Sequence, residues 1–316
     1  MVVDVHGHVT HPDLFKMLPM PASLADIDGM LETKAAAGID MTIVGSPVGF
    51  GTMVPIPGQD NYAQPLDRLK TFHEWLAETV GAHRDAMRAY AYTNPFGGDE
   101  ELAQTAATAR EDGFVGLIVN TSVNGEYLHS DRAGPFFEMA RDLDMPVFLH
   151  PPAAPVGTEA MGDFRLVTHV ARFNDVTSCV ALLAFSGVLG RYPEVEIVAP
   201  MAGGAISLLA ERLDLAATER VPGPPGATPD APPGPPPSEA LARVYLDTST
   251  SSAHALRSDL ALVGAERMLF GTDSPPATVP VEKGLAMVRE LDVTEDERQA
   301  ILGGNAGRLF GLAEST

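Results

Sequence analysis

Two histidines with one residue between them, His6 and His8, lie in the first segment of the chain, MVVDVHGHVT. The β-branched residues Val3 and Val5 predict a buried strand that ends at this pair. Because alternate residues of a strand point to the same side, both imidazoles should face one point, roughly 7 Å apart along the strand. Such a pair suits a shared metal ion, and Gly7 between the histidines lets neighbouring groups come close.

Two further candidate ligands each follow another short apolar segment. His150 stands in PVFLHPP and Asp273 in MLFGTDSPP. A triplet of the form HxH is by itself more often a pair of surface histidines than a metal site. Three strand ends can converge on one point, however, in a barrel or sheet whose strands all end on the same side. Neutral imidazoles and a carboxylate are ligands that suit Zn, Mn or Fe.

The rest of the chain alternates short apolar runs with amphipathic segments. We count eight such strands over 316 residues, which predicts an α/β protein with a single-domain (β/α)₈ TIM barrel spanning residues 1–316. Helices are expected at about 24–37, ended by Gly38, and at about 66–82, and a long helix is expected around 169–192. A Gly- and Pro-rich loop, residues 46–65, is long enough to be a lid or binding loop.

Residues 221–237, VPGPPGATPDAPPGPPP, interrupt this alternation, since nine of the seventeen are proline. Such a sequence cannot continue a helix or enter a sheet, so we expect an extended surface segment. A linker between two domains is the alternative. The segment lies between a helix and the next strand, which in a barrel is the face opposite the active site, so it is interpreted as an insertion without a catalytic role.

The composition, 45% hydrophobic and 20% charged, is typical of a globular protein. The single cysteine, Cys179, cannot form an intramolecular disulfide and fits a reducing compartment. A net charge of -21 argues against binding to nucleic acid or to an anionic membrane surface. We find no signal-peptide pattern and no apolar run long enough to span a bilayer, so a cytoplasmic location is expected. The sequence leaves a homodimer open.

Several stretches, in a fixed order over nearly the whole chain, resemble the amidohydrolase superfamily, in its branch related to aminocarboxymuconate-semialdehyde decarboxylase and the resorcylate decarboxylases. They are DVHGH, GLIVNTSVNGEYLH, PVFLHPP, LLAFSGVLGRYPEVEIVAPMAGGA, VYLDTS, LFGTDSP and ILGGNAGRLFGL. The resemblance implies one divalent metal ion, with zinc favoured over manganese or iron. Its implied ligands are His6, His8, His150 and Asp273. Because Val119 and Asn120 stand where binuclear relatives carry a bridging lysine, a second metal ion is not expected.

The chain departs from this branch at Met201. The strand before the glycine pair usually ends in His, giving the pattern HxGG, but here the sequence is PMAGG. Methionine has no acid or base function. Either Asp273 performs the proton transfer alone, or His11, His129 or His254 substitutes, or the site is inactive.

A second departure concerns the loop 46–65, which in the muconate decarboxylase carries substrate-binding arginines. Here it contains no Arg or Lys, and its side chains include Phe50, Met53, Val54 and Ile56. A carboxylate buried there would lack a partner. We therefore expect a substrate more apolar than a dicarboxylate, in a pocket formed by Phe50, Met53 and Met201. Arg165 and Arg172, which follow His150, are candidates to bind one acid group.

Three functions remain open for this chain and its small-molecule substrate. The first is a metal-dependent hydrolase of an ester, thioester, lactone or amide, in which the metal lowers the pKa of a bound water and Asp273 accepts its proton. The alternative is a non-oxidative decarboxylase of an aromatic or unsaturated acid, in which Asp273 protonates the carbon that loses CO₂. The third is an inactive metal-binding protein.

Overall fold

A sheet of eight parallel strands forms the centre of the computed structural model, in the order β1-β2-β3-β4-β7-β8-β9-β10. The structure describes residues 1–316 except 19, 54–59, 61, 63, 219–234, 251, 277–279 and 313–316. The strands are β1 Val3–His8, β2 Met41–Gly45, β3 Met87–Tyr92, β4 Phe114–Asn120, β7 Val147–His150, β8 Ile197–Ala199, β9 Tyr245–Asp247 and β10 Met268–Leu269.

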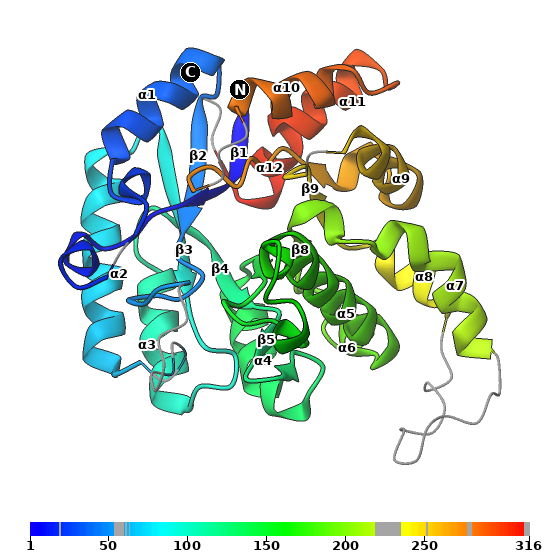
Figure 1. Cartoon of the computed structure of the whole chain (residues 1–316), viewed down its shortest axis with the longest axis horizontal. Coiled ribbons are helices and arrows are strands. Elements are labelled where there is room, and N and C mark those ends of the chain that lie inside the picture. Colours follow the sequence, from blue (N-terminus) through cyan, green and yellow to red (C-terminus); the bar gives the residue numbers. More distant parts are fainter. Residues whose placement is uncertain are drawn as a thin grey trace.

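The sheet curls into a nearly closed barrel, with the helices arranged around its strands (Figure 1). At the seam between the first and last strands, the amide of Val5 donates a hydrogen bond to the carbonyl of Phe270, at 3.0 Å. The predicted (β/α)₈ architecture is therefore confirmed. That residues 1–316 form one domain stays a prediction.

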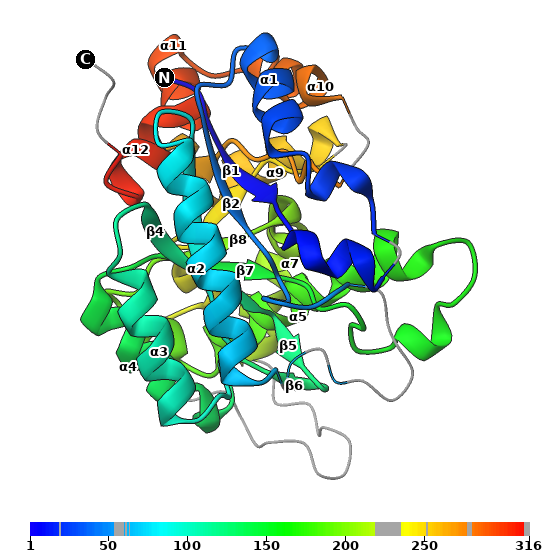
Figure 2. The ribbon, with the colours of Figure 1, turned by 90° about the vertical axis from the view of Figure 1, so that its left-hand side faces the viewer.

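Twelve helices are found among the described residues. They are α1 Ile27–Ala37, α2 Leu66–Ala82, α3 Asp99–Ala109, α4 Gly134–Leu143, α5 Arg172–Phe185, α6 Val188–Arg191, α7 Ile206–Thr218, α8 Pro237–Leu241, α9 Ala253–Val263, α10 Val281–Arg289, α11 Glu295–Gln299 and α12 Asn305–Leu309. Helices α2, α3 and α4 lie next to one another on the outside of the sheet (Figures 1 and 2). Helix α2 buries Leu69, Phe72, Leu76 and Val80, the residues expected from their helical spacing.

Local sequence explains where the structure differs from the predicted bounds. Helix α1 begins at Ile27 rather than near residue 24, because the carboxylate of Asp26 accepts a hydrogen bond from the amide of Gly29 and so caps the helix. The predicted helix at 169–192 is divided into α5 and α6 at Gly187, whose φ of 76° is in the left-handed region. A small hairpin, β5 Ser122–Val123 with β6 Glu126–Tyr127, forms where a loop was expected.

Most of the proline-rich segment 221–237 lies outside the described residues, apart from its end, where Pro237 begins α8. Within the described part of the chain, no helix combines the length and the apolar character needed to cross a membrane.

Candidate metal centre

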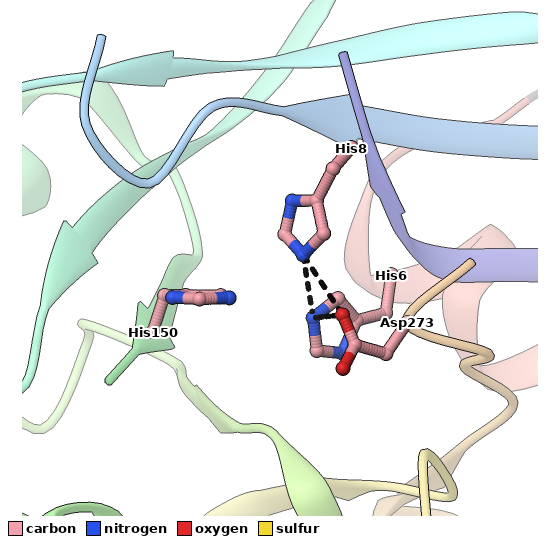
Figure 3. Close-up of side chains that lie close together, drawn as sticks. All are labelled: His6, His8, His150 and Asp273. Atoms are coloured by element: carbon pink, nitrogen blue, oxygen red, sulfur yellow. Dashed lines mark hydrogen bonds and ion pairs between the residues drawn. The ribbon is translucent and has the colours of Figure 1, made fainter. Parts of the chain in front are cut away.

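His6, His8, His150 and Asp273 meet at the end of the barrel where the strands terminate. His6 and His8 come from β1, His150 is the last residue of β7, and Asp273 follows β10. One ligand atom from each of the four lies within 4.8 Å of the others. Figure 3 shows three of the side chains in direct contact, with the His150 ring facing them from across the site.

Each histidine directs Nε2 into the group because its Nδ1 is used elsewhere. The His8 Nδ1–H donates to the carbonyl of Gly45 at 3.2 Å, and the His150 Nδ1–H donates to the carbonyl of Pro151 at 2.8 Å. His6 Nδ1 lies 2.6 Å from the carboxylate oxygen Oδ2 of Asp247. These contacts fix the tautomer of each ring, which leaves the Nε2 lone pair free for a metal ion.

The geometry of the nitrogen atoms fits a cation. His6 Nε2 and His8 Nε2 lie 3.1 Å apart, and Asp273 Oδ1 lies 3.1 Å from His8 Nε2 and 3.4 Å from His6 Nε2. When both rings are neutral with Nδ1 protonated, two lone pairs and a carboxylate oxygen repel one another at these distances unless a cation, either a proton on His6 or a metal ion, lies between them. A divalent ion between them removes the repulsion, and three nitrogens with one oxygen suit zinc, manganese or iron.

Protonation states in the group also favour a metal ion. Burial, followed by the nearby His8 and His6, lowers the pKa of His150 well below its ordinary value, so this ring is neutral near pH 7. Burial would raise the pKa of Asp273, but the imidazoles of His6 and His8 outweigh burial and lower it. The group therefore presents a neutral imidazole and an ionised carboxylate, the forms in which these side chains bind metals.

Asp247, at the end of β9, contacts the candidate site and was not singled out from the sequence. Its Oδ2 contacts His6, and its Oδ1 accepts a hydrogen bond from the Ser249 hydroxyl at 2.7 Å. Ser249 in turn accepts a hydrogen bond from the amide of Met201. A carboxylate that orients a metal-binding histidine is common in metal sites, and the stretch VYLDTS was the available signal.

A cavity of about 560 Å³ opens at this group, and His8, His150 and Asp273 line it, whereas His6 is buried behind them. Met53, Met201, Arg165 and Arg172, which the sequence analysis assigned to a substrate pocket, all line it. Phe50 is not among its lining residues. Its ring lies against His11, with centroids 4.8 Å apart, and beneath the guanidinium of Arg68. Phe50 therefore lies outside the cavity, in contact with His11 and Arg68. Val54 and Ile56 lie outside the described residues.

The three histidines considered as substitutes for the missing imidazole do not line this cavity. His11 is held between the rings of Phe50 and Trp75, and His129 and His254 are exposed at the surface. His169 does line the cavity, beside Arg165 and Arg172. It lies in a π-helical turn, Val167–Ala171, directly before α5. Sequence reasoning overlooked it because no motif marks the position.

Comparison with known proteins links this geometry to a family. The family model described as "Amidohydrolase" matches residues 3–312. A curated relative, 2-amino-3-carboxymuconate-6-semialdehyde decarboxylase of Dictyostelium discoideum, is 26% identical over 64% of this chain; the match spans 55% of that protein, about half of its length. The gamma-resorcylate decarboxylase of a Polaromonas strain is 28% identical over 76% of this chain and 75% of that protein.

Solved structures have the same fold. The 5-carboxyvanillate decarboxylase of Sphingomonas paucimobilis superimposes with a TM-score of 0.80 at 22% identity, over 99% of both chains. A dihydroxybenzoic acid decarboxylase from Polaromonas, solved with manganese and the inhibitor 2-nitroresorcinol, gives a TM-score of 0.76 at 21% identity, over 99% of this chain and 98% of that one.

Proposed function

Because this chain is an enzyme of the amidohydrolase family, we propose that it catalyses the metal-dependent, non-oxidative decarboxylation of an aromatic or unsaturated acid. The observation that carries the proposal is the group of His6, His8, His150 and Asp273 at the floor of a cavity that also contains arginines. The names of the related proteins support it, since each is a decarboxylase of an acid of this kind.

The proposal assigns the four residues to one divalent ion. When bound, the ion would polarise the substrate's oxygens and stabilise the negative charge that develops as CO₂ leaves. The manganese in the related structure makes manganese a candidate beside zinc. Metal analysis of the purified protein by plasma mass spectrometry decides between the two, and well under one equivalent of metal would contradict the assignment.

Asp273 is the proposed acid in this reaction. Its side chain is 34% exposed, toward the cavity, whereas those of His6 and His8 are almost completely buried. After taking up a proton, Asp273 would deliver it to the ring or alkene carbon while the bond from that carbon to the carboxylate breaks. One proton from solvent replaces the proton that is consumed. Met201 cannot take part in this transfer and leaves the cavity apolar on its side.

Hydrolysis, the reaction that the sequence alone favoured, is less well supported than decarboxylation. A hydrolase needs only a metal-bound water and a base, and that is why the missing histidine at position 201 favoured it. The comparisons favour decarboxylation, because the relatives named above are decarboxylases.

Both reactions can be tested with the same metal-loaded protein. We expect CO₂ release from a panel of hydroxybenzoates and unsaturated acids, measured by a coupled carbonate assay, and no hydrolysis of nitrophenyl esters or lactones. Hydrolysis of an ester without release of CO₂ from any acid would reject the proposal.

A further inference from the structure

One wall of the cavity carries three basic side chains from residues 165–172, the segment that leads into α5. Arg165, His169 and Arg172, here called the basic wall, all line the cavity. The amide of His169 donates a hydrogen bond to the carbonyl of Arg165, at 3.2 Å, so the two are one turn apart. Arg172, the first residue of α5, follows His169 by three residues, and its side chain lines the same cavity as those of Arg165 and His169.

Arg172 is the innermost member of the basic wall, and it lacks a partner among the described residues. Its Nε is buried there without a hydrogen-bond acceptor, whereas Arg165 and His169 are exposed at the mouth of the cavity. Burial lowers the pKa of Arg172, and the opposing influences come from Asp273 and Tyr62. Arg172 as a whole is half-buried, and a guanidinium whose Nε is buried without an acceptor carries a desolvation cost, so an anionic ligand in the cavity is the expected partner.

Neither neighbour can serve as that anion. Burial raises the pKa of Tyr62 to about 12, so its phenol stays neutral near pH 7. The Oδ1 of Asp273 is already directed to the histidine nitrogens. Asp175, one turn after Arg172, is used by other groups, because its carboxylate accepts hydrogen bonds from the hydroxyls of Thr121 and Tyr127.

With a metal ion bound, the cavity would carry more positive charge than one acid group of a substrate could neutralise. If His6, His8, His150 and Asp273 held a divalent ion, three neutral imidazole ligands and one carboxylate would leave the group with one net positive charge. The substrate carboxylate that is to leave would balance that charge, and Arg172 would still lack an anion. Asp273 is the single acidic residue among the described residues that line the cavity, although the chain as a whole carries a net charge of -21.

We propose that the substrate carries a second acid group, remote from the carboxylate that leaves, and that Arg172 binds this second group. This inference rests on the proposed decarboxylase function and names its substrate class. It also revises the sequence-based expectation of an apolar substrate: the loop 46–65 lacks arginines, but α5 supplies one from the other side of the cavity. Arg165 and His169, at the mouth, guide the same acid inward.

The test compares ligands that differ in one group. The probes are salicylate, its 4-carboxy and 5-carboxy derivatives, and the corresponding carbamoyl derivatives, titrated into the manganese-loaded protein by calorimetry. The carboxamide has the size of the carboxylate without its charge. We expect the better carboxy isomer to bind about tenfold to a hundredfold more tightly than its carboxamide, the scale of a charge-assisted hydrogen bond.

Variants of Arg172 identify the group that is responsible. In Arg172→Met the preference for the carboxylate should disappear while salicylate binding is unchanged, and Arg172→Lys should restore part of the preference. Arg141→Met, at an exposed arginine of α4, is the matched control and should behave as the parent. Metal content and melting temperature show whether each variant is folded.

Two outcomes overturn the inference. One is that Arg172→Met weakens the binding of salicylate and of its carboxy derivative equally, and the other is that the parent protein does not prefer the carboxy derivative to its carboxamide. Salicylate would then bind with its own carboxylate at Arg172, or the arginine would not contact ligand. Failure of the proposed function is recognised separately, as absence of CO₂ release from every probe despite an intact preference. Absence of binding by all the probes would reject both.

Discussion

Thr272 donates two hydrogen bonds to Asp4, from its amide to Oδ1 at 3.0 Å and from its hydroxyl to Oδ2 at 2.6 Å. Asp4 precedes the first histidine of β1 by two residues, and Thr272 is next to Asp273, so this contact joins the two chain segments that supply the metal ligands. The buried ammonium of Lys34, from α1, also binds Asp4 Oδ2, at 2.7 Å. Gly7 makes room for Lys34, because a Cβ there would lie 3.2 Å from its Nζ.

We predict from this contact that Thr272→Val weakens manganese binding by about tenfold to a hundredfold, the scale for residues that orient metal ligands. Loss of the hydroxyl leaves Asp4 with one fewer donor and frees the segment that carries Asp273. Titration of metal into the stripped protein measures the effect. Thr272→Ser keeps the hydroxyl and should restore most of the affinity; equal loss in both variants would mean that the hydroxyl has no such role.

The pH dependence of metal binding should follow His6. Burial lowers the pKa of His6, but Asp273 and Asp247 outweigh burial and raise it overall. Because the pKa of His6 is higher in the folded, metal-free protein than in the unfolded chain, where it is about 6.5, protonation of His6 stabilises the folded state. This stabilisation is complete below a pH of about 6.5 and is lost as the pH rises through the pKa of the folded protein. Metal must displace this proton, so the gain in melting temperature on metal loading should shrink as the pH falls from about 8 to about 6.

Asp247→Asn tests the cause of this pH dependence. Removing the carboxylate lowers the pKa of His6, so proton release on metal binding should move to lower pH, even though overall affinity falls. Calorimetry in buffers of different ionisation enthalpy counts the protons. A proton release curve that does not move in the variant would show that Asp247 does not set the pKa of His6.

Replacing the proposed acid should abolish turnover. Asp273→Asn removes both a ligand charge and the proton donor, and we expect kcat to fall by a factor on the order of 10² or more. The exposed Asp292→Asn serves as the control and should leave kcat unchanged. Metal content is measured in parallel, because a variant that retains metal but has lost activity assigns the effect to proton transfer.

Replacing Met201 by histidine should add a titratable group to the cavity. Met201 has a φ of 57°, in the left-handed region, and lines the cavity. Histidine adopts this region more readily than most residues, so Met201→His should fold and add a group with a pKa of about 6.5. We expect the pH profile of kcat/KM to gain a new limb near neutral pH, and apolar ligands to bind more weakly. Met53→His places a histidine elsewhere in the cavity. If this variant shows the same new limb in its pH profile of kcat/KM, the effect does not depend on position 201.

Local sequence was enough to predict the barrel and the four converging residues. Most of the strands are short, largely apolar and buried, and a candidate ligand at a strand end can be recognised from the residues next to it in the chain. The contacts of Asp4 with Thr272 and of His6 with Asp247 join residues that are far apart in the chain, 268 and 241 positions respectively. No local pattern specifies such pairs.

The differences between the expected and the observed cavity concern side-chain direction. Phe50 lies in a loop of the expected kind, but stacking on His11 turns it away from the cavity. His169 enters the cavity because a π-helical turn precedes α5, and that turn is not visible in the spacing of apolar residues. Strand and helix periodicity determine which face a regular element presents, but they do not apply to loops and irregular turns.

The seam between β1 and β10 has a mechanical consequence for the metal ion. Among the described residues one backbone hydrogen bond crosses this seam, from Val5 of β1 to Phe270, the residue that follows β10. His6 and His8 lie on one side of the seam and Asp273 on the other. A bound ion would fasten the first strand to the end of the last and so turn an open arc of strands into a ring. Chelation of the metal should therefore speed hydrogen exchange at the Val5 amide more than at amides in the middle of the sheet, such as that of Ile118 in β4.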